Sequence, residues 1–470
     1  MRRDAYGYWI DEATGGRPAA MRPPLEGDVV ADHLVIGGGF LGLWTAWFLA
    51  EAEPGARIVV LEAQRCGYGP SGRNGGFVSP LWDRADDLVA RWGAEAARAI
   101  GEASDTAVDG IGAWCTDQGV DAWYRRAAQL EVATTERHRG LGDGATSACA
   151  ALGVPERRVA LDETETRGRC ASPRFLAATA STLEATVQPA RLAFGLRDRL
   201  AARPGVRIHE GSPVVALDDT PGGVTARTPG GTVRARAAAL CVNTGTASVA
   251  PLRHRFAVAS SHLVITEPVP DVIDALGWTG GESITDGPTL IHYARTTPDG
   301  RIAFGWAGGR MGYGARRRGV LDLDPAVQDR AAAELAWMFP ALASRRIVHG
   351  WGGPIDVSPL HVPLFGTLRS VHWGAGFTGN GVGPSHLGGR ILAGLCRDAR
   401  TPLTRLALVE PAGASGARAF PPEPLRWAGG SITRAALLRI DRAEQEGRRP
   451  DPVSRTLAAI PHRIGFHLPR

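Results

Sequence analysis

The stretch from Asp32 to Gly42, which reads DHLVIGGGFLG, decides the fold because it predicts a short buried strand, a glycine turn and the start of a helix. Gly37, Gly39 and Gly42 fill the pattern G-x-G-x-x-G. In that pattern the glycines turn the chain, let the backbone approach a pyrophosphate and let the helix pack on the strand. An apolar helix from Leu41 to Ala52 would point its first amides at the phosphates.

A second strand with an acidic end follows this unit. Arg57 to Glu62 reads RIVVLE, and Glu62 lies twenty residues after Gly42. A carboxylate at that distance accepts hydrogen bonds from the ribose hydroxyls of an adenosine. The whole strand–turn–helix–strand–acid unit therefore predicts a dinucleotide site. A glycine-rich turn without a ligand is the alternative.

Composition sets limits on the other classes of protein. The length of 470 residues predicts two or three domains, and 44% hydrophobic with 21% charged residues fits a globular protein. No apolar run is long enough for a membrane span, and no apolar segment follows the two N-terminal arginines, so we expect a cytoplasmic location. Six scattered cysteines and twelve histidines without ligand spacing predict neither a disulfide framework nor a metal site.

The net charge of +5 comes from arginine alone, since the chain contains no lysine. These arginines are spread along the sequence, which favours a solvated surface over a nucleic-acid patch. Asparagine is rare in this chain, and its side chain suits a cofactor edge because it carries both a donor and an acceptor. The three asparagines, all in segments that we assign to the cofactor, are Asn74, Asn243 and Asn380.

Glycine-rich loops and alternating patterns divide the rest of the chain. Residues 67–76 contain five glycines and a proline, which predicts a loop. We expect helices over 81–116 and 187–202, and strands over 130–134, 206–210 and 213–217. Two hairpin turns follow, and then a buried strand over 237–245 that ends in small residues, as a strand does where it meets a cofactor.

A second region reads mainly as antiparallel sheet. Residues 260–266 predict a strand, and 290–295 with 301–306 predict a hairpin around the turn TPDG. A helix should begin at Pro325, and a third glycine cluster over 374–386 should lead into a helix over 387–396. Residues 1–30 predict an extended surface arm, and 411–425 a linker. A final helix over 431–447 should turn Ile432, Ala435, Leu438 and Ile440 inward and Arg434, Arg439 and Arg442 outward.

Taken together, three motifs resemble a known family. The dinucleotide unit, the loop Ser71-Gly72-Arg73-Asn74-Gly75-Gly76, and the pair WGGP (351–354) and GFTGNGV (376–382) occur in the order and spacing of FAD-dependent amine and amino-acid oxidases. These form the D-amino-acid oxidase/glycine oxidase superfamily, and the SGRNGG loop is most similar to its gamma-glutamylputrescine oxidase-like branch. The resemblance spans residues 6–450.

The resemblance implies an α/β (α+β) fold, with a Rossmann-type FAD-binding domain of discontinuous segments and an antiparallel-sheet substrate domain. The FAD-binding domain would take residues 31–80, 180–250 and 346–405, and the substrate domain residues 81–179 and 251–345. Residues 1–30 would form an N-terminal arm, and residues 406–470 a C-terminal linker and amphipathic helix.

The resemblance and the glycine-rich strand ends together give an expected set of FAD-binding residues. They are Gly37, Gly38, Gly39, Phe40, Leu41, Gly42, Glu62, Ala63, Ser71, Arg73, Asn74, Gly75, Gly76, Val214, Asn243, Gly245, Gly376, Gly379, Asn380, Gly381 and Val382. Some relatives attach FAD through a cysteine, but Cys396 matches no such motif, so we expect non-covalent FAD. The lysine that assists oxygen reaction in some relatives is absent, which leaves oxidase and dehydrogenase both open.

Substrate contacts are expected from the hairpin. Tyr293 or His292 could orient an amine and Arg295 could bind a carboxylate, while Trp306 is equally explained by the core. His292 and Tyr293 alternate along a strand, so at most one of them should face the flavin. His386 has either a loop or a helix-cap role, and the helix that begins near Pro384 would stabilise negative charge on the flavin.

The expected reaction is hydride transfer from a small amine or amino acid to FAD, which gives an imine that hydrolyses. The electron acceptor would be oxygen or another, unidentified one. Neither a nucleic acid nor a membrane is an expected partner, and a homodimer stays open. Three alternatives remain: an FAD monooxygenase that uses NAD(P)H, an NAD-dependent dehydrogenase, and a flavoprotein or RNA-binding module without catalysis.

Overall fold

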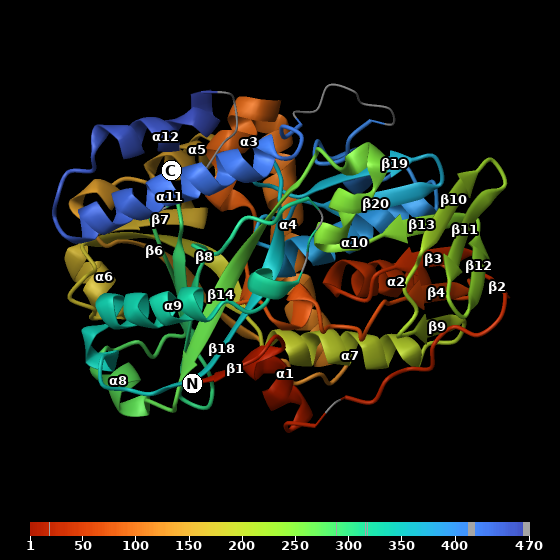
Figure 1. Ribbon diagram of the computed structural model, residues 1–470, viewed down its shortest axis with the longest axis horizontal. Coiled ribbons are helices and arrows are strands. Elements are labelled where there is room, and N and C mark those ends of the chain that lie inside the picture. The colour runs from red at the N-terminus through yellow and green to blue at the C-terminus, as the bar shows by residue number, and fades with distance from the viewer. Residues whose placement is uncertain (18, 288, 315, 317, 412–418, 464–470) are drawn as a thin grey trace.

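The computed structural model describes residues 1–470 except 18, 288, 315, 317, 412–418 and 464–470. Figure 1 shows two regions that lie side by side, a region of α/β layers on the right and a large twisted sheet with its covering helices on the left. The described strands form sheets of ten, six and four strands. The expected α/β (α+β) fold is confirmed.

The six-stranded sheet holds the glycine motif and has the order β19-β20-β13-β3-β4-β9. All of its neighbouring strands run parallel except β19, which is antiparallel to β20. Its strands are β3 (His33–Ile36), β4 (Ile58–Leu61), β9 (Val206–His209), β13 (Ala237–Leu240), β19 (Leu364–Leu368) and β20 (Val371–Ala375).

Alternate residues of these strands enter two different hydrophobic cores. Val35 and Val60 pack with three helices, α2 (Phe40–Ala52), α7 (Pro189–Ala201) and α10 (Val382–Cys396). Leu34 and Val59 pack instead with the four-stranded sheet. That sheet has the order β10-β11-β12-β2, from β10 (Ala216–Thr220), β11 (Gly223–Thr228), β12 (Gly231–Ala235) and β2 (Val29–Val30), and both expected hairpin turns are confirmed.

The ten-stranded sheet has the order β1-β18-β14-β17-β16-β15-β6-β8-β5, with β7 also paired to β8. It is mostly antiparallel, the parallel pairs being β1 with β18 and β15 with β6. Its strands are β1 (Arg2–Arg3), β5 (Phe77–Val78), β6 (Arg125–Ala133), β7 (Arg158–Leu161), β8 (Ala177–Thr186), β14 (Ala257–Thr266), β15 (Ser283–Asp286), β16 (His292–Thr296), β17 (Ile302–Trp306) and β18 (Ile347–Val357).

One face of this sheet packs on α8 (Pro270–Ala275) and α9 (Pro325–Met338), and the expected hairpin of β16 and β17 is confirmed. Strand β18 and most of β8 pair within this sheet, although their residues fall in the ranges expected for the FAD-binding domain. Strands β8 and β18 therefore belong to the large sheet, and the chain passes from each of them directly into the other region.

Three expectations about helices are wrong. The helix expected over 81–116 is two helices, α3 (Ala85–Trp92) and α4 (Ala94–Asp117), because Gly93 between them has a φ of +83°. Two short helices complete this region, α5 (Asp143–Ala151) and α6 (Glu163–Arg169).

The N-terminal arm is not simply extended, since it contains β1 and the helix α1 (Gly7–Thr14), whose Trp9 is fully buried.

The C-terminal helix also differs from its expected form. It runs as α11 (Leu425–Gln445), and a further helix α12 (Pro452–Arg463) packs on it. Its buried residues are Arg426, Thr433, Ala436, Leu437 and Ala443, whereas Ile432 is 51% exposed. Of the residues expected to face inward, Leu438 packs on the core of the large sheet but Ala435 is exposed like Ile432. Arg434, expected outward, turns partly inward to donate to the Gly308 carbonyl. Part of the expected linker, 412–418, lies outside the described residues. No helix of the described chain is long and apolar enough to cross a membrane.

The fold predicts that Gly42 tolerates no side chain, because a Cβ there would lie 1.9 Å from the Gly37 carbonyl oxygen. We expect Gly42→Ala to destabilise the protein by about 1–3 kcal/mol, the usual cost of overpacking, and to lower the melting temperature measured by circular dichroism. Gly55→Ala is the matched control, since nothing lies within 4 Å of a Cβ at Gly55. Equal melting temperatures for the two variants would contradict this account.

Candidate active site

Three chain turns meet at the carboxyl edge of the six-stranded sheet. Strand β13 lies between β3 and β20 in parallel register, so the residues after these strands, Gly37, Cys241 and Gly376, share one edge. Cys241 N–H donates to the Ile36 carbonyl at 2.8 Å. Gly37 has a φ of +110°, and a Cβ on it would lie 2.3 Å from the Cys241 carbonyl oxygen. Only glycine fits this approach of two turns.

Asp356, at the end of β18, ties the second and third turns together. Its carboxylate accepts from Gly376 N–H at 2.6 Å and from Asn243 Nδ2 at 3.1 Å, and it is 1% exposed. Burial raises the pKa of Asp356 to about 7, against the opposing effect of its N–H donors. Sequence reasoning placed Asn243 and Gly376 here but missed Asp356, which carries no motif of its own.

Helices α2 and α10 both begin at this edge of the six-stranded sheet. Helix α2 begins after Gly39 and helix α10 after Gly381, and neither has a side-chain cap or an acidic residue in its first turn. The Phe40 N–H donates to Ser71 Oγ at 2.8 Å, which fixes the second loop over the start of α2. Helix N-termini favour anions, and only the first amide of α2 is taken by Ser71, so this edge fits a pyrophosphate at α2 and a polarised ring edge at α10.

The acidic end of β4 fits the adenosine half. Glu62 accepts from Gly38 N–H at 2.7 Å and from Gln64 N–H at 2.9 Å, and no ion pair to it exists in the described chain. Burial raises the pKa of Glu62. Each carboxylate oxygen keeps a free lone pair for a ribose hydroxyl. Ala63 beside it is exposed, and Val214, expected at the adenine, is half-buried where the chain leaves β9.

The loop of residues 70–76 is held by its own polar side chains. Asn74 Nδ2 donates to the carbonyls of Pro70 and Ser71, and Asn74 Oδ1 accepts from Gly76 N–H at 2.7 Å. Asn74 therefore shapes the loop through bonds to its backbone, and the N–H groups of Gly72, Arg73 and Gly76 are all bonded within this segment.

Arg73 points away from this edge. It forms an ion pair with Asp322 at 3.0 Å and donates to the carbonyls of Ala5 and Gly352. In return, Trp351 Nε1 donates to the Arg73 carbonyl at 2.8 Å. The Arg73 side chain therefore connects the loop to the N-terminal arm and the large sheet, and its contact with the cofactor stays a prediction.

Tyr293 is the hairpin residue that faces the loop. Its ring packs edge-on against Phe77 at 5.7 Å between centroids, and its hydroxyl lies 2.7 Å from Ser261 Oγ. A Cβ on Gly75 would lie 3.0 Å from the Tyr293 ring, and one on Gly305 only 2.0 Å from it. Because Gly305 has no side chain, the Tyr293 ring can lie across β17, and its hydroxyl reaches Ser261.

His292 lies on the opposite face of the sheet, which corrects its expected catalytic role. Its Nδ1 is 2.6 Å from Asp286 and its Nε2 is 3.6 Å from Glu334 of α9. Asp286 and Glu334 raise the pKa of this histidine against the effect of burial. Trp306 is on the same face, stacked 6.3 Å from His292, and belongs to the core.

Arg295 is buried without an acidic partner in the described chain. It is 2% exposed, and its Nε and Nη2 atoms have no hydrogen-bond acceptor. Burial alone lowers the pKa of Arg295 to about 9. A Cβ on Gly76 would lie 3.1 Å from the guanidinium carbon, so the charge sits against the second loop. Such an arrangement can bind an anion.

The remaining expected residues take several positions around the edge. Asn380 donates to the Pro80 carbonyl at 3.4 Å, Gly379 has a φ of +88° with open space beside it, and Gly245 is buried after β13. His386 is a core residue packed on Trp44 and Phe48, and burial lowers its pKa to about 3. All six cysteines are buried, Cys396 at the end of α10, which fits non-covalent attachment of FAD.

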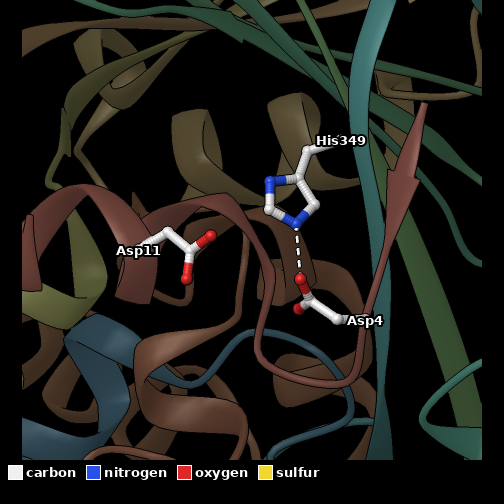
Figure 2. Close-up of side chains that lie close together, drawn as sticks. All are labelled: Asp4, Asp11 and His349. Atoms are coloured by element: carbon white, nitrogen blue, oxygen red, sulfur yellow. Dashed lines mark hydrogen bonds and ion pairs between the residues drawn. The ribbon is translucent and has the colours of Figure 1, made fainter. Parts of the chain in front are cut away.

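One cluster of metal-ligand side chains occurs in the described chain, at the N-terminal arm. Ligand atoms of Asp4, Asp11 and His349 lie within 4.8 Å of one another (Figure 2). His349 Nε2 is 2.8 Å from Asp4, and Arg2 forms ion pairs with both carboxylates. Because Arg2 already pairs with both carboxylates and His349 with one of them, we interpret the cluster as an anchor for the arm.

Comparison with known proteins identifies the family of this chain. Residues 32–395 match the family profile described as FAD dependent oxidoreductase, DAO. The chain is 29% identical over 378 residues to gamma-glutamylputrescine oxidoreductase of Escherichia coli K12, which covers 79% of this chain and 85% of that protein.

Solved structures share the fold. Glycine oxidase from Geobacillus kaustophilus has a TM-score of 0.64 at 19% identity, covering 79% of this chain and 96% of its own. L-proline dehydrogenase from P. horikoshii has a TM-score of 0.65 at 16% identity, covering 82% and 96%. At identities of 19% and 16%, the similarity to these two structures shows a shared fold alone.

The site predicts that Asp356 is needed to hold FAD. In Asp356→Asn the amide NH₂ would face either the Gly376 N–H or Asn243 Nδ2, so one donor stays unpaired. We expect about tenfold to hundredfold weaker FAD binding, measured by the fluorescence of FAD released on dilution. The exposed Asp117→Asn is the control. Unchanged FAD retention in Asp356→Asn would refute the role of this carboxylate.

Proposed function

The chain belongs to the family of FAD dependent oxidoreductases, and from that premise we propose that it oxidises the C–N bond of a small amino acid or another amine that carries a carboxylate. The observation that carries this proposal is Arg295, a buried cation without an acidic partner in the described chain, set against Gly76. The similarity to gamma-glutamylputrescine oxidoreductase supports an amine as the substrate class.

Bound FAD supplies the acceptor for a hydride from the carbon next to the amine nitrogen. The glycine turns at 37–39 and 376–381 and the loop 70–76 would hold it through backbone amides. The N-terminus of α10 supports the proposal because its uncapped amides and dipole stabilise negative charge that develops on the ring. The imine product leaves and hydrolyses in water.

Arg295 and Tyr293 would position the substrate between the loop and the sheet. Both side chains project from the same face of β16, two residues apart, and both contact the loop. The guanidinium would bind the carboxylate, which leaves the carbon–nitrogen bond to lie along the Tyr293 ring. The Tyr293 hydroxyl, held by Ser261, would accept from or donate to the amine nitrogen.

The alternatives from the sequence are weaker. An NAD(P)H-using monooxygenase would share the dinucleotide unit, yet the family match extends over both later glycine loops. The choice between oxygen and another acceptor, the cytoplasmic location and a homodimer stay predictions from the sequence.

Anaerobic reduction of the purified flavoprotein tests the proposal. We expect one class of carboxylate-bearing amines to bleach the oxidised-flavin band in the absence of oxygen, because the substrate supplies the hydride. Admission of air then separates an oxidase, whose colour returns, from a dehydrogenase. Bleaching by NADPH without any amine would sink the proposal in favour of the monooxygenase.

The role of Arg295 has its own test. In Arg295→Gln we expect the half-saturating concentration of the carboxylate-bearing amine to rise about tenfold to hundredfold, since a charge-assisted bond is lost. Bleaching by an amine without a carboxylate should change little. Arg98→Gln is the control, because Arg98 pairs with Glu102 on the surface of α4. An equal effect on both kinds of amine would speak against carboxylate binding.

A further inference from the structure

The N-terminal arm folds back against the buried arginine. Strand β1 pairs in parallel with β18 at His349 and Gly350, and α1 follows it directly. A Cβ on Gly7, the first residue of α1, would lie 2.4 Å from the Trp351 ring, whose Nε1 holds the loop at Arg73. Figure 1 shows α1 beside β18 and the start of α7. The family match begins only at residue 32, after this arm.

Trp9 of α1 covers the guanidinium. The Arg295 guanidinium carbon lies 4.9 Å from the centroid of the Trp9 ring, and Trp9 has no solvent exposure. Its Nε1 is buried and has no hydrogen-bond acceptor. An aromatic face attracts a cation most strongly where water is excluded. The ring therefore holds the guanidinium in place without neutralising its charge.

Two polar anchors fix the arm. At its start, Asp4 pairs with His349 (Figure 2) and accepts from the Gly7 N–H at 2.6 Å. Arg2 bridges Asp4 and Asp11. The His349 pair helps to hold the pKa of Asp4 well below its usual range, against the effect of burial. The arm is thus held by charged contacts at the edge of the large sheet.

The second anchor joins the arm to the loop. Gln188 Nε2 donates to the Trp9 carbonyl at 2.7 Å and to Glu12 at 2.6 Å. The preceding residue, Val187, donates its N–H to the Gly76 carbonyl at 2.8 Å. Trp9 and Gly76 are therefore held by adjacent residues of one strand end, with the Arg295 guanidinium against both.

We propose that the N-terminal helix α1 is a wall of the anion subsite, in which Trp9 positions the Arg295 guanidinium and excludes water from it. This inference rests on the proposed function, because it assigns the anion to the substrate carboxylate. The ligand class is a small carboxylate. Trp9 is a positioning residue: it acts on the anion through Arg295 and on amines without a carboxylate not at all.

Binding of propionate, a carboxylate without an amine, tests the wall. Propionate is titrated into the full-length FAD-loaded enzyme, and the shift of the flavin absorption band gives its affinity. We expect Trp9→Leu to weaken propionate binding at least about tenfold, and Trp9→Phe, which keeps an aromatic face, about threefold or less. Trp427→Leu, which changes an exposed tryptophan, should match the unchanged protein. Affinity of Trp9→Leu within twofold of the unchanged protein overturns the proposal.

A second measurement needs no variant, since loss of a buried tryptophan can prevent folding. Hydrogen exchange of the amides in residues 7–14 is followed in the unchanged holoenzyme with and without saturating propionate. Slower exchange with propionate supports the wall, and unchanged exchange overturns it. Failure of the proposed function would look different, because then no amine bleaches the flavin while propionate titration and exchange still report on the subsite.

Discussion

The parallel register of β3, β13 and β20 is the constraint on which the rest of the site depends. Strand β13 pairs with β3 on one side and β20 on the other, so three turns separated by more than a hundred residues each share one edge. The Gly37 and Cys241 turns approach so closely that a side chain on Gly37 would displace the Cys241 carbonyl. The N-termini of α2 and α10 are aimed by these turns, and with them the backbone amides that fit FAD.

The loop 70–76 connects this edge of the six-stranded sheet to the large sheet. Ser71 binds the start of α2, while Arg73 reaches Asp322 and the Gly352 carbonyl on the far side. Strand β5 follows the loop at once and pairs with β8, so Phe77 meets Tyr293. One short segment therefore connects the turns of the six-stranded sheet to the face of the large sheet that carries Tyr293 and Arg295.

How much of this could be read from sequence depends on whether a feature is local. The glycine motif and the hairpin were predictable because spacing and strand alternation are local properties. Alternation also required His292 and Tyr293 to face opposite ways, but the face that meets the loop is set by α9, whose Glu334 lies beside His292. Asp356 could not be found, since its partners at 243 and 376 are far away in the chain.

The arm and the last helix show the same limit. A helix of eight residues in a glycine- and proline-rich arm has little stability of its own and forms because Trp9 packs in the core. In α11 the periodicity of Ile432 and Leu438 predicts one inward face. Leu438 does pack on the core of the large sheet, but Ile432 is exposed, and Thr433, Ala436 and Leu437 are buried. Tertiary packing overrides pattern where apolar residues are distributed around a helix.

Among the buried arginines of the described chain, Arg295 differs because it has no acidic partner. Arg73 and Arg158 are also buried, but Arg73 pairs with Asp322 and Arg158 with Glu131 at 2.6 Å. Glu131 raises the pKa of Arg158 against the effect of burial, whereas nothing opposes burial at Arg295. A buried charge left without a partner costs a protein about 3–5 kcal/mol. The fold tolerates that cost at Arg295 and covers the charge with Trp9. In the proposed site, a substrate carboxylate would supply the missing partner where no water competes for the guanidinium.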